Sequence, residues 1–177
     1  MRYSENDIVE GLDAWQDEFE KGWLASYHQT GVINWEQYRP PVNRQPISGA
    51  GIDLAASRLM LISSSGAYLP RTQDPFDAQN PIGDYSVREI PAHTDLKQLA
   101  YAHDHFDHTA VNADPQVLLP ADHLRRFAAE GMIGHLTNIA SFMGYQPDVS
   151  RVVDQTLPSI LEFATKEQAQ AALLVPS

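Results

Sequence analysis

The feature that most constrains the fold is a run of four consecutive apolar residues, Leu59–Ile62, followed directly by serines and a glycine at 63–66. An unbroken apolar run that ends in turn formers is typical of a strand buried on both faces of a parallel sheet. A second run, Ala171–Val175, has the same character. Loops and helical patterns alternate with such runs along the chain, which predicts an α/β fold with a mainly parallel sheet and flanking helices in a Rossmann-like three-layer arrangement.

The N-terminal region predicts an amphipathic helix over residues 5–30. One apolar stripe at helical spacing carries Ile8, Leu12, Trp15, Phe19, Trp23 and Tyr27. We expect this stripe to pack against the core or against a second subunit of a homo-oligomer, because burial of aromatic rings is favourable. Residues 36–53 are rich in proline and glycine and predict an extended arm. We therefore expect residues 1–50 to form a helix with its arm, and residues 51–177 to form the α/β domain.

The other elements are predicted from periodicity and from turn formers. A long loop covers 70–84, and residues 95–102 fit either a helical turn or a strand. The remaining expectations are a strand at 85–90, a helix at 120–130, a strand at 133–139, a helix at 149–166 interrupted at Pro158, and a buried strand at 171–175.

Composition excludes several classes of protein. The 177 residues contain no cysteine, which excludes disulfides, zinc–thiolate sites and a thiol nucleophile within them. The net charge of −11 argues against nucleic-acid and anionic-membrane partners, both of which need clustered Lys and Arg. No apolar run reaches the ~18 residues of a membrane span, and the N-terminus does not look like a signal peptide. We expect a soluble protein of the cytoplasm.

The densest group of reactive side chains is the segment His103-Asp104-His105-Phe106-Asp107-His108. In an extended segment the side chains of His103, His105 and Asp107 share one face, whereas a helix would bring His105 and His108 together. Histidine titrates near neutral pH, so His103, His105, Asp107 and His108 are candidate catalytic residues for proton transfer. His103, His105 and His108 are also candidate ligands of a divalent metal ion. A solvated loop without chemistry is the alternative.

Candidate substrate-binding residues follow the first strand and flank the second. Ligands of open α/β sheets bind beyond the carboxyl ends of strands, which favours Ser63, Ser64, Ser65 and Gly66. Arg88 and Asp84 lie where a long loop meets a strand, and Arg88 suits a substrate carboxylate. Alternatively, Arg88 pairs with Asp84 or Asp77 and rigidifies the loop. A serine hydrolase is disfavoured, because the sequence has no GxSxG elbow.

Several segments, read in order, resemble the glycine/sarcosine/betaine reductase selenoprotein B family and the related selenoprotein subunit of D-proline reductase. The resemblance runs from about residue 58 to Ser177. The segments are Leu61–Leu69 (LISSSGAYL), Asp74–Asp77 (DPFD), Gly83–Pro91 (GDYSVREIP), His103–His108 (HDHFDH), Asn112–Arg126 (NADPQVLLPADHLRR), Glu130–Leu136 (EGMIGHL), Ser141–Tyr145 (SFMGY) and Ala171–Pro176 (AALLVP).

The resemblance implies reductive cleavage of a carbon–nitrogen bond in an amine or amino-acid-like small molecule. In that family a selenocysteine or cysteine, placed directly after a strand, attacks the α-carbon, and partner subunits complete the reductase. By this resemblance His105 or His108 would protonate the leaving amine, and Arg88 would anchor a substrate carboxylate. No cofactor is implied with certainty, and a divalent metal ion stays an option.

The sequence departs from the family at the nucleophile. The strand that looks equivalent is Ala171–Val175, and neither Cys nor selenocysteine follows it. Two explanations are a product truncated at a UGA codon and a naturally short homologue. Two other interpretations stay open: a self-contained metal- or small-molecule-binding enzyme that uses the histidine segment, and a non-catalytic subunit that dimerises through the aromatic stripe.

Overall fold

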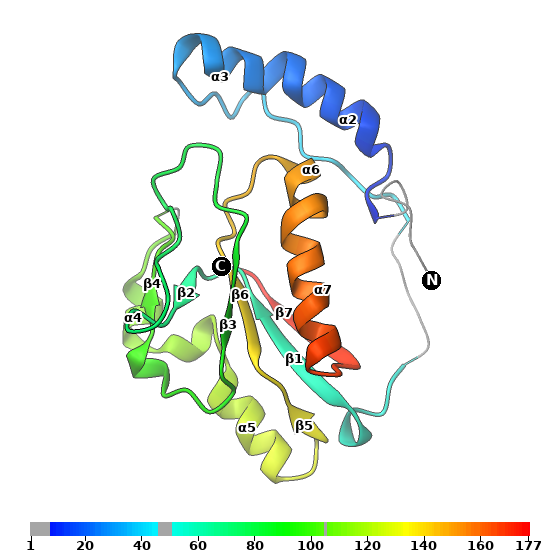
Figure 1. Cartoon of the computed structure of the whole chain (residues 1–177), viewed down its shortest axis with the longest axis vertical. Coiled ribbons are helices and arrows are strands. Elements are labelled where there is room, and N and C mark those ends of the chain that lie inside the picture. The colour runs from blue at the N-terminus through cyan, green and yellow to red at the C-terminus, as the bar shows by residue number, and fades with distance from the viewer. Residues whose placement is uncertain (1–7, 46–50, 105) are drawn as a thin grey trace.

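The computed structural model describes residues 8–45, 51–104 and 106–177 (Figure 1). It is a mixed α/β structure with a mostly parallel sheet, which confirms the predicted fold class at that level. The start of the predicted N-terminal helix, residues 5–7, and residues 46–50, which hold the predicted domain boundary, lie outside the described residues.

The sheet is organised around β1 (Arg58–Ser63), which is buried almost throughout. On one edge, β1 pairs in parallel with β7 (Ala171–Val175) over its whole length. On the other edge it pairs in parallel with β5 (His135–Leu136) and then with β6 (Ile139–Phe142). The last strand, β3 (Val87–Ile90), is antiparallel to β6. The first apolar run of the sequence is therefore the central strand, as expected.

Side chains of β1 alternate between two cores. Leu59 and Leu61 pack with Leu124 of α5 (Ala121–Ala129). Met60 and Ile62 pack with Ile160 of α7 (Leu157–Lys166). Because successive side chains of a strand point to opposite faces, each face of the sheet has its own covering helix.

A small antiparallel sheet lies beside the main one (Figure 1). It consists of β2 (Ala67–Tyr68) and β4 (Ala100–Tyr101), so the ambiguous stretch 95–102 contains both a helical turn and a strand. The short helical elements are η2 (Leu54–Ala56), η3 (Leu96–Gln98), α4 (Thr109–Ala113) and η4 (Pro115–Val117).

The predicted N-terminal helix is interrupted at residues 9–11, after a helical Ile8. The long helix that follows runs through α2 (Leu12–Phe19), the π-helical turn η1 (Glu20–Leu24) and α3 (Ala25–Thr30). Gly11 precedes it with φ +67°, a left-handed conformation that does not continue a helix. Trp15, Phe19 and Trp23 are buried against Val153 of the same chain. The aromatic stripe is thus used inside this chain, and the expected homo-oligomer stays a prediction.

The second long helix is not broken at Pro158. It continues through α6 (Val149–Arg151), the π-helical turn η5 (Val152–Thr156) and α7. Proline has no N–H for the carbonyl four residues earlier, and the wider π turn just before it accommodates that loss. The predicted helix of residues 120–130 corresponds to α5, with Pro120 as its N-cap residue.

Strand β7 forms as predicted but is not a buried strand. It lies at the edge of the sheet, and the side chains of Leu173 and Leu174 are 37% and 70% exposed. An uninterrupted apolar run does not distinguish a central strand from an edge strand whose faces are uncovered.

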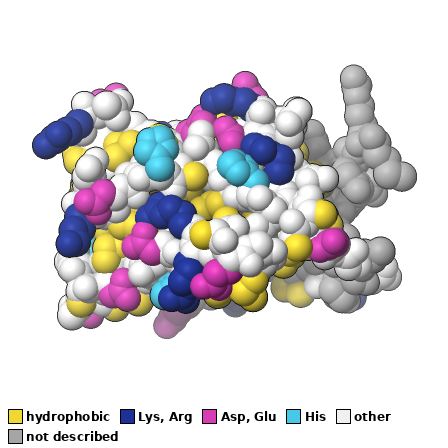
Figure 2. Space-filling view, turned by 90° about the horizontal axis from the view of Figure 1, so that it is seen from below, with side chains coloured by type: hydrophobic (Ala, Val, Ile, Leu, Met, Phe, Trp, Pro, Cys, Tyr) yellow, Lys and Arg dark blue, Asp and Glu magenta, His cyan; other side chains and the backbone are white. Residues whose placement is uncertain are grey.

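Charge is not segregated on the face seen in Figure 2, which views the molecule from the α5 and β5 end. Basic, acidic and histidine side chains are interspersed there despite the net charge of −11. Among the described residues, no helix combines the length and the apolar character that crossing a membrane requires.

Candidate functional site

The carboxyl end of β1 is the junction of three other segments. The Ser64 N–H donates to the carbonyl of Val175 at 3.2 Å, and its carbonyl accepts the Gly144 N–H at 3.0 Å. The Gly66 N–H donates to the carbonyl of Phe142 at 2.8 Å, and its carbonyl accepts the Ala102 N–H at 3.0 Å. The serine–glycine turn therefore ties the ends of β6 and β7 to the start of the histidine segment.

A cavity of about 410 Å³ opens at this junction. Ser64 and His103, both predicted site residues, lie in its wall. Among the described residues, the lining is Ser64, His103, Phe106, Phe142, Gly144, Tyr145, Pro176 and Ser177. We call this cavity the sheet-edge pocket. Its place beyond the carboxyl ends of parallel strands is where open α/β sheets bind ligands.

Two glycines allow the walls of the sheet-edge pocket to approach each other. A Cβ on Gly144 would lie 3.1 Å from the Ser64 hydroxyl and 3.2 Å from His103 Nε2. Ser64 and His103 therefore present polar atoms toward the same point. Gly66 has φ +65°, and a Cβ there would lie 2.8 Å from the carbonyl oxygen of Ala102. A side chain at Gly66 would clash with the backbone, whereas one at Gly144 would require Ser64 and His103 to shift slightly.

Of the two described histidines of the segment, His103 lines the pocket, and it is only 4% exposed. The ring of Phe106 packs edge-on against it, with centroids 5.1 Å apart. The Nε2 of His108 lies 2.8 Å from the carbonyl oxygen of His103. His108 is not part of the pocket wall, and its predicted catalytic role stays a prediction. His105 lies outside the described residues, so its predicted catalytic role stays a prediction.

Asp107 supports the start of α4. Its carboxylate accepts the Thr109 N–H at 2.9 Å and the Thr109 hydroxyl at 2.7 Å. These two bonds, the hydroxyl foremost, lower the pKa of the exposed Asp107 carboxyl. Asp107 is not part of the pocket wall, and its predicted catalytic role stays untested.

Asp84 and Arg88 are held within the long loop. The Asp84 carboxylate accepts the Asp77 N–H at 2.8 Å and the backbone N–H and hydroxyl of Ser86. The Arg88 guanidinium donates to the Ser86 hydroxyl and to the carbonyl of Asp74, and it lies 4.4 Å from the centroid of the Phe76 ring. Arg88 therefore holds the loop through backbone carbonyls and Ser86, whereas the expected pairing with Asp84 or Asp77 is not among the ion pairs of the described residues. The substrate-binding roles of both residues stay predictions.

The other two serines of the turn are buried. The Ser63 hydroxyl donates to the carbonyl of Leu118 at 2.9 Å. The Ser65 hydroxyl is fully buried and has no hydrogen-bond partner among the described residues. Neither side chain reaches the pocket wall, so Ser64 is the serine of the turn that lies there.

Phe106, Phe142, Gly144 and Tyr145 were not predicted as site residues. Tyr145 also holds the long loop, since its hydroxyl donates to the carbonyl of Pro81 at 2.9 Å. Phe142, Gly144 and Tyr145 could have been predicted only from the order of the strands in the sheet. Residues that follow β6 must meet residues that follow β1, because the two strands are parallel neighbours.

The metal-ion prediction is not tested by the structure. Within the described ranges, which omit His105, no group of three or more His, Asp or Glu side chains could hold a metal ion.

Comparison with known proteins shows the family of the chain. The family model for glycine/sarcosine/betaine reductase selenoprotein B matches residues 35–152, which include Ser64, His103 and Gly144. The chain belongs to this family. The selenoprotein B resemblance seen in the sequence is thereby confirmed.

A curated relative supports the same assignment. The chain is 33% identical over 96 residues to D-proline reductase subunit gamma of Acetoanaerobium sticklandii. The match covers 54% of this selenoprotein B-family chain and 40% of the relative, so the chain matches about two fifths of that subunit's length. No solved structure matches the chain significantly.

Proposed function

We propose that this chain supplies the substrate-binding part of a reductase that cleaves the carbon–nitrogen bond of an amine or amino-acid-like small molecule. The observation that carries the proposal is the convergence of Ser64 and His103 in the sheet-edge pocket, within a chain of the selenoprotein B family. Helices on both faces of the sheet would make a Rossmann-like three-layer frame that holds the pocket rigid.

The polar atoms of the pocket suit an amino-acid-like ligand. The Ser64 hydroxyl suits a carboxylate oxygen, which accepts a hydrogen bond. His103 suits the amine end, where a protonated imidazole would give its proton to the departing nitrogen. Phe106 and Phe142 would exclude water from the reacting carbon. His108 would keep the His103 segment in place through the His103 carbonyl.

The attacking atom is proposed to come from outside these 177 residues, which contain no cysteine. A thiolate or selenolate would form a bond to the α-carbon as the carbon–nitrogen bond breaks, and the amine would leave with a proton. A dithiol of a partner reductase subunit would then cleave the new carbon–sulfur or carbon–selenium bond: the α-carbon would gain a hydrogen, the thiol or selenol would be released, and the dithiol would be oxidised to a disulfide. The relative is itself a subunit by name, which supports partner subunits for this chain.

Two alternatives from the sequence have no specific structural support. The histidine segment contributes one histidine to the pocket wall among the described residues, which does not favour a separate metal enzyme. The aromatic stripe is buried within the chain, which does not favour a scaffold that dimerises through it.

The test is a heteronuclear NMR titration of the chain with glycine, sarcosine, betaine and D-proline. We expect the amides of Gly144 and Tyr145 to shift with at least one of these probes. His103→Ala should weaken that binding about tenfold, the effect of losing one charge-assisted hydrogen bond. His123→Ala, an exposed position on α5, is the matched control. The proposal is wrong if none of the probes shifts the pocket amides.

A further inference from the structure

The strand that leads into the sheet-edge pocket contains one extra residue. Leu59 of β1 pairs with Leu136, and Ile62 of β1 pairs with Ala140. Between these two pairs β1 advances by three residues, whereas its neighbour advances by four. One residue is therefore inserted between β5 and β6, at Thr137–Asn138, which is a β-bulge.

The bulge changes which side chains face which core. Leu136 and Ile139 both pack in the core under α5, and Ala140 packs in the core under α7. In an unbroken strand, residues three apart point to opposite faces. The inserted residue thus exchanges the sheet face to which each side chain of β6, and of the residues after it, points.

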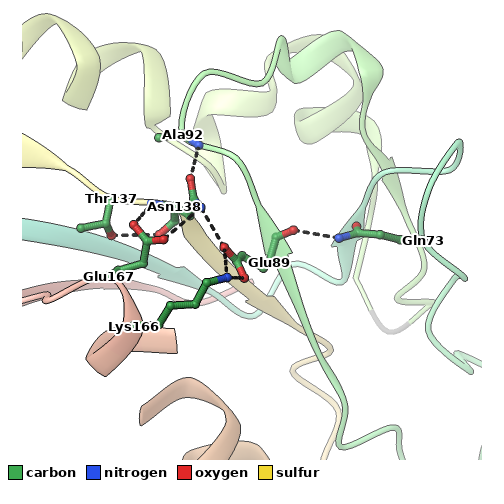
Figure 3. Close-up of polar contacts among 7 residues, drawn as sticks. All are labelled: Gln73, Glu89, Ala92, Thr137, Asn138, Lys166 and Glu167. Carbon is green, nitrogen blue, oxygen red and sulfur yellow. Dashed lines mark hydrogen bonds and ion pairs between the residues drawn. The ribbon is translucent and has the colours of Figure 1, made fainter. Parts of the chain in front are cut away.

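Asn138 clamps the bulge from three sides, as Figure 3 shows. Its Oδ1 accepts the Ala92 N–H at 3.1 Å. Its Nδ2 donates to Glu89 Oε1 at 2.8 Å and to Glu167 Oε1 at 3.1 Å. Lys166 pairs with Glu89 at 2.8 Å and completes the network.

An amide is the side chain that fits this clamp. It offers two N–H donors to two carboxylates and one oxygen to a backbone N–H. An ionised aspartate would offer only acceptors and would place a third negative charge between Glu89 and Glu167.

The consequence lies at the end of β6. Phe142 and Gly144 line the sheet-edge pocket, whereas Ser141 and Met143 are fully buried. In a strand without the inserted residue, Ser141 and Met143 would face the pocket, and Phe142 and Gly144 would face away from it. The pocket wall therefore depends on the bulge.

We propose that Asn138 is a positioning residue for the sheet-edge pocket: by clamping the bulge, it sets which residues of the β6 end face a ligand. The pocket's role as a substrate site rests on the proposed function, but the clamp is tested without any substrate.

The test uses the absence of cysteine in the chain, which allows single-cysteine reporters. Phe142→Cys and Ser141→Cys are compared by their rates with a small disulfide reagent. With Asn138 present, we expect Cys at 142 to react at least about tenfold faster than Cys at 141, because the first lines the pocket and the second is buried.

The clamp is then removed with Asn138→Asp in each reporter chain. We expect the ratio of the two rates to fall by about tenfold or to invert, the effect of losing charge-assisted hydrogen bonds. Asn112→Asp, an exposed asparagine of α4, is the matched control and should leave the ratio within about twofold.

If Asn138→Asp lacks native far-UV circular dichroism, the milder Asn138→Ser replaces it, with an expected fall of about threefold. An unchanged ratio in a folded variant overturns the proposal and leaves Asn138 with a purely structural role. Failure of all amine probes to bind the unmodified chain, with the ratio behaving as expected, would disprove the proposed function and keep the clamp.

Discussion

At the scale of single residues, the sheet-edge pocket depends on a glycine in a left-handed conformation. Gly66→Ala should destabilise the protein by about 3 kcal/mol, because a methyl group would add overpacking against the Ala102 carbonyl to the strain of positive φ. Gly131→Ala is the control: its φ is +75° with no atom within 4 Å of a Cβ, so about 1 kcal/mol is expected. Urea unfolding measures both, and equal losses would contradict the steric argument.

The two buried serines beside the pocket should respond oppositely to loss of the hydroxyl. Ser65→Ala removes a buried hydroxyl that has no partner among the described residues, and it should leave the free energy of unfolding unchanged or raise it by up to about 1 kcal/mol. Ser63→Ala removes a hydrogen bond to the Leu118 carbonyl and should lower the free energy of unfolding by about 1 kcal/mol. Thermal and urea unfolding test the pair. A destabilised Ser65→Ala would mean that its hydroxyl has a partner in solution.

The sequence indicated two residues of the pocket wall at this scale, and their functional roles stay predictions. Ser64 and His103 were found because a turn after a buried strand and a histidine cluster are both local patterns. The partners of Arg88 were not found, since Asp74 and Pro75 offer carbonyl groups whose direction depends on the loop conformation. Gly144 and Phe142 were missed because only the pairing of β6 with β1 brings them to Ser64.

At the scale of elements, the long loop before β3 is held by a carboxylate. Burial raises the pKa of Asp84, but hydrogen bonds from Ser86 and Asp77 outweigh burial and leave the pKa below its usual range. A carboxylate with a lowered folded-state pKa stabilises the fold above its unfolded pKa, and this contribution disappears as the pH falls through the folded pKa.

Asp84→Asn should therefore lower the free energy of unfolding by a constant amount above about pH 5, and the difference should shrink below about pH 4. Chemical unfolding over pH 2.5–7 measures it. Asp154→Asn, an exposed position in η5, is the control and should show no such difference. If the free energies of unfolding of Asp84→Asn and the unmodified protein still differ at the lowest pH, the stabilisation does not come from the ionised Asp84 carboxylate.

Elements with strong local signals were the best predicted. The strands β1 and β7 and the helix α5 lie within about one residue of their expected bounds. The predicted strand at 133–139 is divided by the bulge, because the amide partners of Asn138 come from β3 and from the end of α7. Such partners are distant in the sequence, so no local sequence pattern predicts them.

At the scale of the whole molecule, the N-terminal helix is joined to the α/β region by a shared apolar cluster. Phe19 is buried among Trp15, Trp23 and Val153, and the Tyr38 hydroxyl donates to the Pro147 carbonyl at 2.9 Å. These contacts indicate that helix and sheet unfold together.

Phe19→Ala should lower the free energy of unfolding by about 3–5 kcal/mol and shift a single unfolding transition to lower urea concentration. Val32→Ala, at a largely exposed position, should cost less than about 0.5 kcal/mol. Tryptophan fluorescence and far-UV circular dichroism are recorded on the same samples. Two separated transitions would show that the N-terminal helix is an independent unit.

The pairing of β1 also has a consequence for how the chain folds. The partners of β1 lie about 80 and 110 residues further along the sequence, at β5, β6 and β7. Closing such long loops costs entropy before any strand contact repays it, so folding should take milliseconds to seconds rather than microseconds. Until β7 pairs, one edge of the apolar strand β1 has no hydrogen-bonding partner. Slow pairing of β7 would therefore leave this edge open to aggregation.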